Sequence, residues 1–137
     1  MRKPARLTLP ALLVGVFVGA LGSQLLYAQQ QAVTRTPLLQ QDLVGLDGKE
    51  VNMYIAEIAA GAQSGRHYHP GHEITYVLSG SGTFEMEGQP NQTFREGSRV
   101  YVAPRKIHNA KNDGSTPLKV LVVMVHLKGE PPVVPVQ

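Results

Sequence analysis

Apolar and polar residues alternate over short stretches from about residue 50 onwards, and Gly, Pro-Gly or Asp-Gly separate these stretches. The turn residues recur at the spacing of roughly 8–12 residues that is typical of all-β sandwiches and barrels. No stretch after residue 30 has the apolar spacing of a long amphipathic helix. The stretches richest in β-branched and aromatic residues, which we expect to be strands, are Val51–Ile58, Ile74–Leu78, Thr83–Met86, Arg99–Val102 and Leu118–Leu127.

The last of these stretches is apolar at nearly every position from Val120 to Val125. A strand of this kind is buried on both faces, either in the core of a two-sheet fold or against a second copy of the chain. The pattern therefore allows a homodimer.

The N-terminus has a basic segment, Met1 to Arg6, followed by an uncharged apolar run from Leu7 to Gly22. This order is typical of a secretory signal peptide, with cleavage after Ala28 or, as a second option, after Ala20. The run is shorter than the ~20 residues of a bilayer span, but with Leu25 to Tyr27 it can serve as an uncleaved membrane anchor. We expect an exported, periplasmic protein if the segment is cleaved. If it is not cleaved, we expect a protein anchored in the membrane and facing the periplasm.

The excess of basic residues is confined to this leader. The chain has 13 Lys and Arg against 10 Asp and Glu, and Arg2, Lys3 and Arg6 account for the difference. The remaining domain is neutral apart from its histidines, so it has no electrostatic surface for nucleic acid. The absence of cysteine excludes thiolate ligands and cysteine nucleophiles.

Three histidines and one carboxylate form a candidate metal site. His67 and His69 are two residues apart, so a strand would place both side chains on one face. Glu73 has the same parity, although Pro70-Gly71 interrupts the run, and His108 follows further along. Imidazole and carboxylate together suit a divalent transition metal, namely iron, manganese, nickel, copper or zinc.

The spacing of these residues resembles the cupin superfamily. Its first motif is matched by Gly61, His67, His69, Glu73 and Gly80 at every spacing, and its second by Gly97, His108 and Asn112. Two departures lie in the second motif, where Ala103 stands at the expected proline and Arg105 at the expected glycine.

The resemblance implies a single cupin-like β-barrel of two antiparallel sheets, of the jelly-roll type. It also implies a metal held by His67, His69, Glu73 and His108. Within the chain we expect a signal or anchor over residues 1–28, a linker or leading arm over 29–45, the barrel over 46–128 and an irregular Pro-rich tail over 129–137.

Several other residues are candidates for lesser roles. His72, of opposite parity, is expected at the rim of the site, and His126 as a hydrogen-bonded core or interface histidine. Asn112 is expected to stabilise a turn. The side chains considered for the barrel lining or its mouth are Tyr76, Tyr101, Arg66 and Arg99.

Two classes of function stay open. The first is a metal-dependent enzyme on a small organic molecule, either a dioxygenase-like oxidoreductase or a Lewis-acid enzyme, with Glu73 also able to act as a catalytic base. The second is a non-catalytic protein that binds or senses a small ligand or the metal itself. Cupins of this ligand set carry out several reactions, so turnover has to separate the two classes.

Overall fold

The strands predicted from the alternating pattern are present in the computed structural model, which describes residues 32–136. They belong to ten strands: β1 (Val33–Asp42), β2 (Lys49–Ile58), β3 (His67–Tyr68), β4 (His72–Ser79), β5 (Ser81–Met86), β6 (Gln92–Arg95), β7 (Arg99–Val102), β8 (His108–Lys111), β9 (Leu118–Leu127) and β10 (Val134–Pro135). The described residues contain no helix, and hence none that could cross a membrane. The all-β prediction is confirmed.

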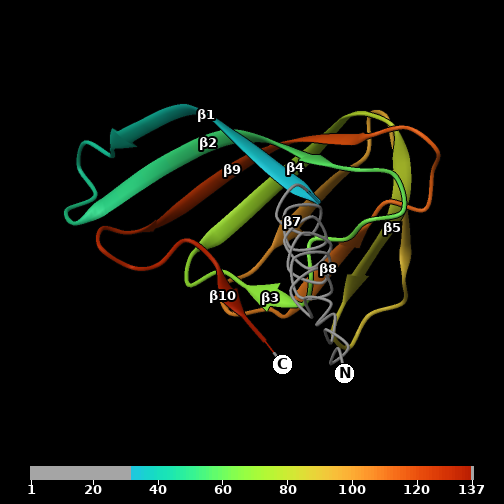
Figure 1. The fold of residues 1–137 in the computed structure, drawn as a ribbon. Coiled ribbons are helices and arrows are strands. Elements are labelled where there is room, and N and C mark those ends of the chain that lie inside the picture. The colour runs from blue at the N-terminus through green and yellow to red at the C-terminus, as the bar shows by residue number, and fades with distance from the viewer. Residues whose placement is uncertain (1–31, 137) are drawn as a thin grey trace, which may run out of the picture. The chain divides into compact units, whose positions relative to one another are not determined.

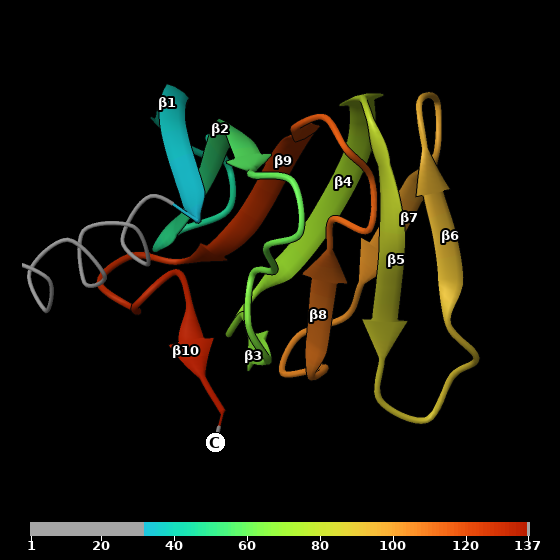
Figure 2. The ribbon, with the colours of Figure 1, turned by 45° about the vertical axis from the view of Figure 1, so that its right-hand side comes forward.

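The strands form two antiparallel five-stranded sheets. The first sheet has the order β1-β2-β9-β4-β7, and the second has the order β10-β3-β8-β5-β6. Figure 1 shows the long strands of the first sheet across the top, with β3, β8 and β5 below them, and Figure 2 shows the second sheet from the side of β5 and β6. Because consecutive segments cross between the sheets, residues close in sequence can reach one cavity from opposite layers.

The hydrophobic core lies between the inner faces of the two sheets. Alternate residues of β9 point inward and are buried, from Leu118 through Val122 to Met124. The stacked rings of Phe84 and Phe94 complete the core from the second sheet, with centroids 4.8 Å apart. Only the inner face of β9 is fully buried in the single chain, since the residues between these positions are half-exposed.

The segment that we expected to be a linker or leading arm, residues 29–45, contains β1. This strand pairs with β2 along its length and forms one edge of the first sheet, with a bulge between Pro37 and Leu39. Proline is tolerated in edge strands because one side of the backbone makes no ladder hydrogen bonds. The polar, Gln-rich composition did not predict this strand, because its side chains are exposed along most of its length and it is stabilised by backbone pairing with β2.

The tail, which we expected to be irregular, contains the short strand β10. Val134 pairs with Tyr68, and Pro135 pairs with His67. The expected signal or anchor over residues 1–28 lies outside the described residues.

Candidate metal centre

Two of the four candidate ligands face each other across the second sheet. His67 on β3 is the register partner of His108 on β8, and their ring centroids lie 4.3 Å apart. Both residues are buried in the protein interior. Residues directly opposite each other in an antiparallel pair point to the same face of the sheet. The pairing therefore brings together two imidazoles that are 41 positions apart in the sequence.

The other two candidates reach the same place from the connection between the sheets. His69 follows β3, and Glu73 is the second residue of β4 in the first sheet. Between them the chain passes so close to β9 that a Cβ on Gly71 would lie 2.2 Å from the Val125 carbonyl oxygen. The glycine therefore permits the tight crossing that returns the Glu73 carboxylate toward the histidines.

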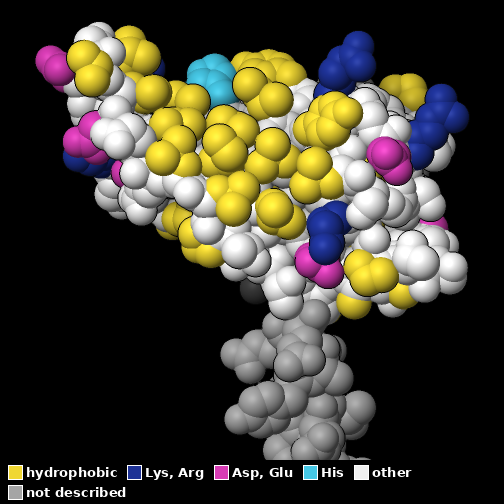
Figure 3. All heavy atoms as spheres, turned by 90° about the horizontal axis from the view of Figure 1, so that it is seen from above, with side chains coloured by type: hydrophobic (Ala, Val, Ile, Leu, Met, Phe, Trp, Pro, Cys, Tyr) yellow, Lys and Arg dark blue, Asp and Glu magenta, His cyan; other side chains and the backbone are white. Residues whose placement is uncertain are grey.

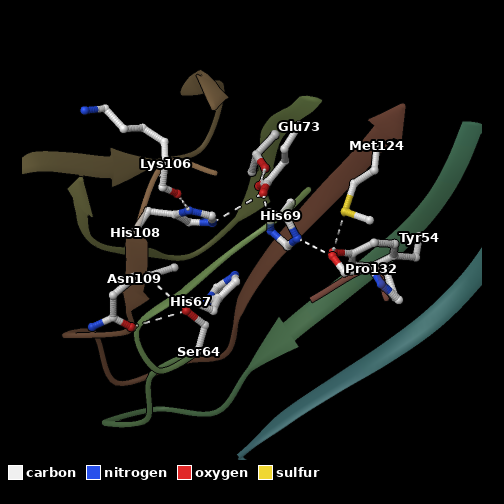
Figure 4. Close-up of polar contacts among 12 residues, drawn as sticks. Tyr54, Ser64, His67, His69, Glu73, Lys106, His108, Asn109, Met124 and Pro132 are labelled. Atoms are coloured by element: carbon white, nitrogen blue, oxygen red, sulfur yellow. Dashed lines mark hydrogen bonds and ion pairs between the residues drawn. The ribbon is translucent and has the colours of Figure 1, made fainter. Parts of the chain in front are cut away.

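The three imidazole rings all present the same nitrogen to the cavity. The Nδ1 atoms of His67, His69 and His108 lie 2.7, 2.5 and 2.9 Å from the backbone carbonyl oxygens of Gly65, Pro132 and Lys106. A carbonyl oxygen can only accept, so each Nδ1 must carry the hydrogen. The ligating atoms of the three rings lie within 4.8 Å of one another. Figure 4 shows the three rings gathered in one place. This buried triad can hold a metal ion.

Glu73 lies against this triad with one oxygen anchored and one left over. Thr75 donates a hydrogen bond of 2.5 Å to Oε1. The second oxygen, Oε2, lies 2.6 Å from Nε2 of His69 and 3.3 Å from Nε2 of His108. In a neutral ring whose hydrogen is on Nδ1, Nε2 has no hydrogen to donate, and Oε2 is the one buried side-chain polar atom of the described residues without a hydrogen-bond partner. An unsatisfied carboxylate oxygen beside three imidazole nitrogens fits a divalent cation.

The charges in the cavity are strongly coupled. Burial opposes ionisation of Glu73, but the contacts with His108 and His69 outweigh it and hold the pKa of Glu73 well below its usual range. Burial also disfavours a charged His69, yet the Glu73 carboxylate and the Pro132 carbonyl together raise the pKa of His69. For His67, burial prevails and lowers the pKa to about 4. The carboxylate is thus ionised and the His67 ring neutral, as metal binding requires.

The cavity itself is small and mostly apolar. It has a volume of about 50 Å³, and a water molecule takes up about 30 Å³ of the liquid. Its walls include Phe84, Phe94 and Val122 from the two sheets. A low-polarity lining strengthens the contacts among the charged groups and limits the entry of water.

The candidates for the barrel lining lie elsewhere. Tyr76 and Tyr101 are exposed on the outer face of the first sheet, and His72 is exposed with them, its Nδ1 lying 2.7 Å from the Tyr101 hydroxyl. Arg66 and Arg99 are also exposed at the surface. The expectation that these tyrosines could line the barrel is therefore wrong, because alternation along β4 and β7 points them outward, opposite to Glu73.

The two remaining candidates are placed as expected. His126 is buried and hydrogen-bonded in the first sheet, with its Nε2 2.6 Å from Nδ2 of Asn52. Asn112 donates to the carbonyls of Ile58 and Thr116 and accepts from the backbone N–H of Gly114. It therefore holds the turn before β9.

The departures from the second motif leave the turn intact. Pro104 and Arg105 occupy the centre of a turn closed by a 3.2 Å bond from the Lys106 N–H to the Ala103 carbonyl. Arg105 takes the left-handed conformation that suits glycine, with a φ of 62°. Its backbone N–H donates to the His69 carbonyl at 2.7 Å, so the turn fixes the position of a candidate ligand.

Sequence reasoning missed three contributors to the site. Thr75 shares the parity of Glu73 and could have been found from it. Pro132 acts through a backbone carbonyl, for which the sequence has no signal. Arg35 borders the cavity from β1, a strand that was not predicted.

Residues 54–124 match the family described as Cupin domain. This match spans just over half of the chain and includes the three histidines of the triad, so the chain belongs to the cupin family. No curated protein sequence matches the chain.

Solved structures share the fold at low identity. The DMSP lyase DddQ from Ruegeria pomeroyi DSS-3 is 24% identical with a TM-score of 0.64, over 77% of this chain and 52% of that one. An oxalate oxidase in complex with the substrate analogue glycolate is 22% identical with a TM-score of 0.59, over 75% and 54%. The polyketide cyclase RemF from Streptomyces resistomycificus is 18% identical with a TM-score of 0.61, over 78% and 72%. The chain thus spans about half the length of the first two proteins, and these identities show a common fold.

Proposed function

We propose that this cupin is a metal-dependent enzyme on a small organic substrate, with His67, His69, Glu73 and His108 as ligands of one divalent transition metal. The observation that carries the proposal is the common orientation of the three imidazoles, each with Nδ1 bound to a carbonyl and Nε2 toward the cavity. Second-sphere bonds of this kind fix the tautomer of metal-binding histidines. The unsatisfied Oε2 of Glu73 supports the same proposal.

Bound there, iron, manganese, nickel, copper or zinc would supply either dioxygen activation, in an oxidoreductase of the dioxygenase kind, or Lewis-acid polarisation of a substrate oxygen. Glu73 is the group of the chain that can take a proton from the substrate. Thr75 holds Oε1, so Oε2 is the oxygen that faces the reacting atoms.

The solved structures support an enzyme on a small molecule without selecting a reaction. One is a lyase, one an oxidase with glycolate bound, and one a cyclase. A cavity of about 50 Å³ beside the triad accepts only a few atoms of a substrate, in keeping with attack on one functional group.

The experiment is elemental analysis of protein isolated from an exporting host. Wild type should carry close to one equivalent of metal, and a His67→Ala, His69→Ala double variant should carry none. His72→Ala is the matched control, because that histidine is exposed on the outer face of the sheet. A folded wild type that stays metal-free after reconstitution sinks the proposal.

A non-catalytic protein that binds a small ligand or the metal is the second candidate, because the same triad could hold a metal without turnover. Turnover separates the two. Oxygen uptake and product formation would be followed with a panel of small organic acids on metal-loaded protein. Activity that disappears in Glu73→Gln, with metal retained, favours the enzyme, whereas tight binding without turnover favours the binding protein.

We further propose that the chain is exported to the periplasm through its N-terminal segment. Terminal sequencing of protein from an exporting host tests this. A mature protein that starts at Gln29 or Leu21 indicates a cleaved signal, whereas an intact Met1 in the membrane fraction indicates an anchor. An intact chain in the cytoplasm contradicts export.

We also propose that the outer face of the first sheet pairs with a second copy of the chain. In most antiparallel sheets with one exposed face the outward residues are polar. Here they form the broad hydrophobic area in Figure 3, where register neighbours are Ile74 with Val123 and Tyr76 with Leu121. An exposed apolar patch marks an interaction surface, and a two-fold dimer would use the same patch on both copies.

Light scattering after gel filtration tests the dimer. Val123→Glu at the centre of the face should yield a monomer, while Val44→Glu, at a fully exposed loop position, should stay dimeric. A monomeric wild type contradicts the proposal.

A further inference from the structure

A second and larger cavity lies on the inner face of the first sheet. It is a groove of about 620 Å³ bordered by β1, β2, β9 and the tail from Gly129 to Val133. Pockets of about 300–1,000 Å³ are the usual size for small-molecule ligands. Arg35 and Tyr54 border both this groove and the metal cavity, so the two spaces adjoin.

One end of the groove presents a buried carboxylate. Glu50 is only 7% exposed, and its Oε2 accepts a 2.9 Å hydrogen bond from Gln40. Its Oε1 lies 3.5 Å from Nε2 of His126. Glu130, from the tail, borders the same groove. Buried carboxylates in ligand sites are normally paired with a cation or with several donors.

His126 is not that donor. Its Nδ1 lies 3.0 Å from the Leu127 carbonyl and so carries the hydrogen. In the neutral ring Nε2 then carries a lone pair, which accepts a hydrogen bond from the amide N–H of Asn52 at 2.6 Å. Lys128 is held by Asp42 at 2.7 Å. Oε1 of Glu50 therefore keeps an acceptor position for a group that enters the groove.

The other end of the groove is basic. Arg35 makes no salt bridge within the described residues, in which every ion pair has another cation. Residues 1–31 contain no aspartate or glutamate. Tyr54 lies beside it, and burial, with the charge of Glu73, raises the pKa of Tyr54 to about 12. Its hydroxyl is thus a donor at all ordinary pH; it lies 3.8 Å from the Met124 sulfur and also interacts with the Arg35 side chain.

The wall between the two ends is largely apolar, with Met124, Pro131 and Pro132 along it, and the amide N–H of Asn52 in this wall is engaged by His126. Glu50 and Tyr54 are four residues apart on the same strand, β2, which is a separation of about 13 Å at roughly 3.3 Å per residue. The charged ends are therefore separated by a stretch that suits an aliphatic chain.

We propose that the groove binds an elongated zwitterion, with its ammonium end at Glu50 and its carboxylate end at Arg35 and Tyr54. An aliphatic spacer would lie against Met124 and the tail prolines. The carboxylate end then lies at the boundary of the metal cavity. Such a zwitterion would be the substrate class of the proposed enzyme, a conclusion that rests on the proposed function.

Isothermal titration calorimetry with ω-aminooctanoate, and with its hexanoate and decanoate homologues, tests the site on chelator-treated protein. Wild type should bind the best-fitting amino acid about tenfold more tightly than the carboxylate of the same length without the amine, since a charge-assisted hydrogen bond has roughly that effect. Glu50→Gln should lose this preference.

Glu57→Gln is the matched control. Glu57 lies on the same strand but pairs with Lys119 at 3.3 Å, away from the groove, and the variant should keep the preference. If Glu50→Gln does not fold, Arg35→Gln on the exposed edge strand replaces it, and it should lose the preference for ω-aminooctanoate over octylamine. Equal affinity for all the probes, or no binding of any homologue in the millimolar range, overturns the inference.

The readout is independent of the metal. Because the titrations use metal-free protein, failure of the groove leaves the elemental analysis of the triad unchanged. Failure of the triad to bind metal likewise leaves the amine preference measurable.

Discussion

Oε2 of Glu73 and Nε2 of His69 lie 2.6 Å apart and join the first sheet to the connection between the sheets. The contact raises the pKa of His69, although burial opposes it, while burial lowers the pKa of His67 to about 4. The Glu73 carboxylate therefore favours a proton on His69, which a metal would have to displace, whereas burial favours the neutral ring of His67.

Metal affinity should accordingly fall as the pH is lowered through the raised pKa of His69. Below that pKa the affinity decreases about tenfold per pH unit for each proton displaced. His67 adds to this loss only near pH 4. Calorimetry in buffers of different ionisation enthalpy should detect proton release on metal binding that increases as the pH is lowered. Metal uptake without proton release would contradict the assigned protonation of His69.

Removing the hydroxyl that anchors Glu73 should weaken metal binding without unfolding the protein. In Thr75→Val, Oε1 loses its 2.5 Å donor, and loss of such an outer-sphere bond typically lowers affinity about 10- to 100-fold. Competition with a chromophoric chelator measures this. Thr75→Ser keeps the hydroxyl and should bind metal like wild type, and an equal loss in both variants would point to packing instead.

Arg105→Gly should stabilise the protein. Arg105 holds a φ of 62°, a conformation that costs a non-glycine residue about 1–2 kcal/mol, whereas the added freedom of glycine in the unfolded chain costs about 0.5–1 kcal/mol. We expect a gain of up to about 1 kcal/mol in the free energy of unfolding by urea. Lys106→Gly, next to it, should destabilise. A destabilised Arg105→Gly would show that the arginine side chain contributes contacts of its own.

Gly71→Ala should destabilise the protein and displace Glu73. A Cβ at this position would meet the backbone of Val125 and His126 at 2.2 to 2.8 Å, and forced overpacking costs about 1–3 kcal/mol or more. Gly88→Ala is the control for loss of a glycine without a clash: its φ of 77° is positive, unlike that of Gly71, but nothing lies within 4 Å of the added Cβ. The temperature of thermal unfolding and the metal content should both fall in Gly71→Ala. In Gly88→Ala only the temperature of unfolding should fall.

Much of this architecture is readable from the sequence because alternation and turn residues are local signals. The five predicted strands lie within β2, β4, β5, β7 and β9. The structure also brings His67, His69, Glu73 and His108 together, as the spacing of the two motifs predicts. Their role as ligands remains a prediction.

What escaped prediction depends on long-range contacts. β1 is polar and contains Pro37, and only its pairing with β2 makes it a strand. The outward direction of Tyr76 and Tyr101 depends on which face of β4 and β7 meets the second sheet. A pattern of period two defines two faces but does not say which one is inside.

The C-terminal tail contacts the candidate metal centre at two points. The Pro132 carbonyl accepts the Nδ1 hydrogen of a ring 63 positions earlier, and β10 covers the edge strand that carries His67. A deletion from Gly129 onwards would remove none of the four proposed ligands, yet it would free the His69 ring and uncover β3. Truncations, tags or fusions at the C-terminus would therefore change the surroundings of His69 and His67.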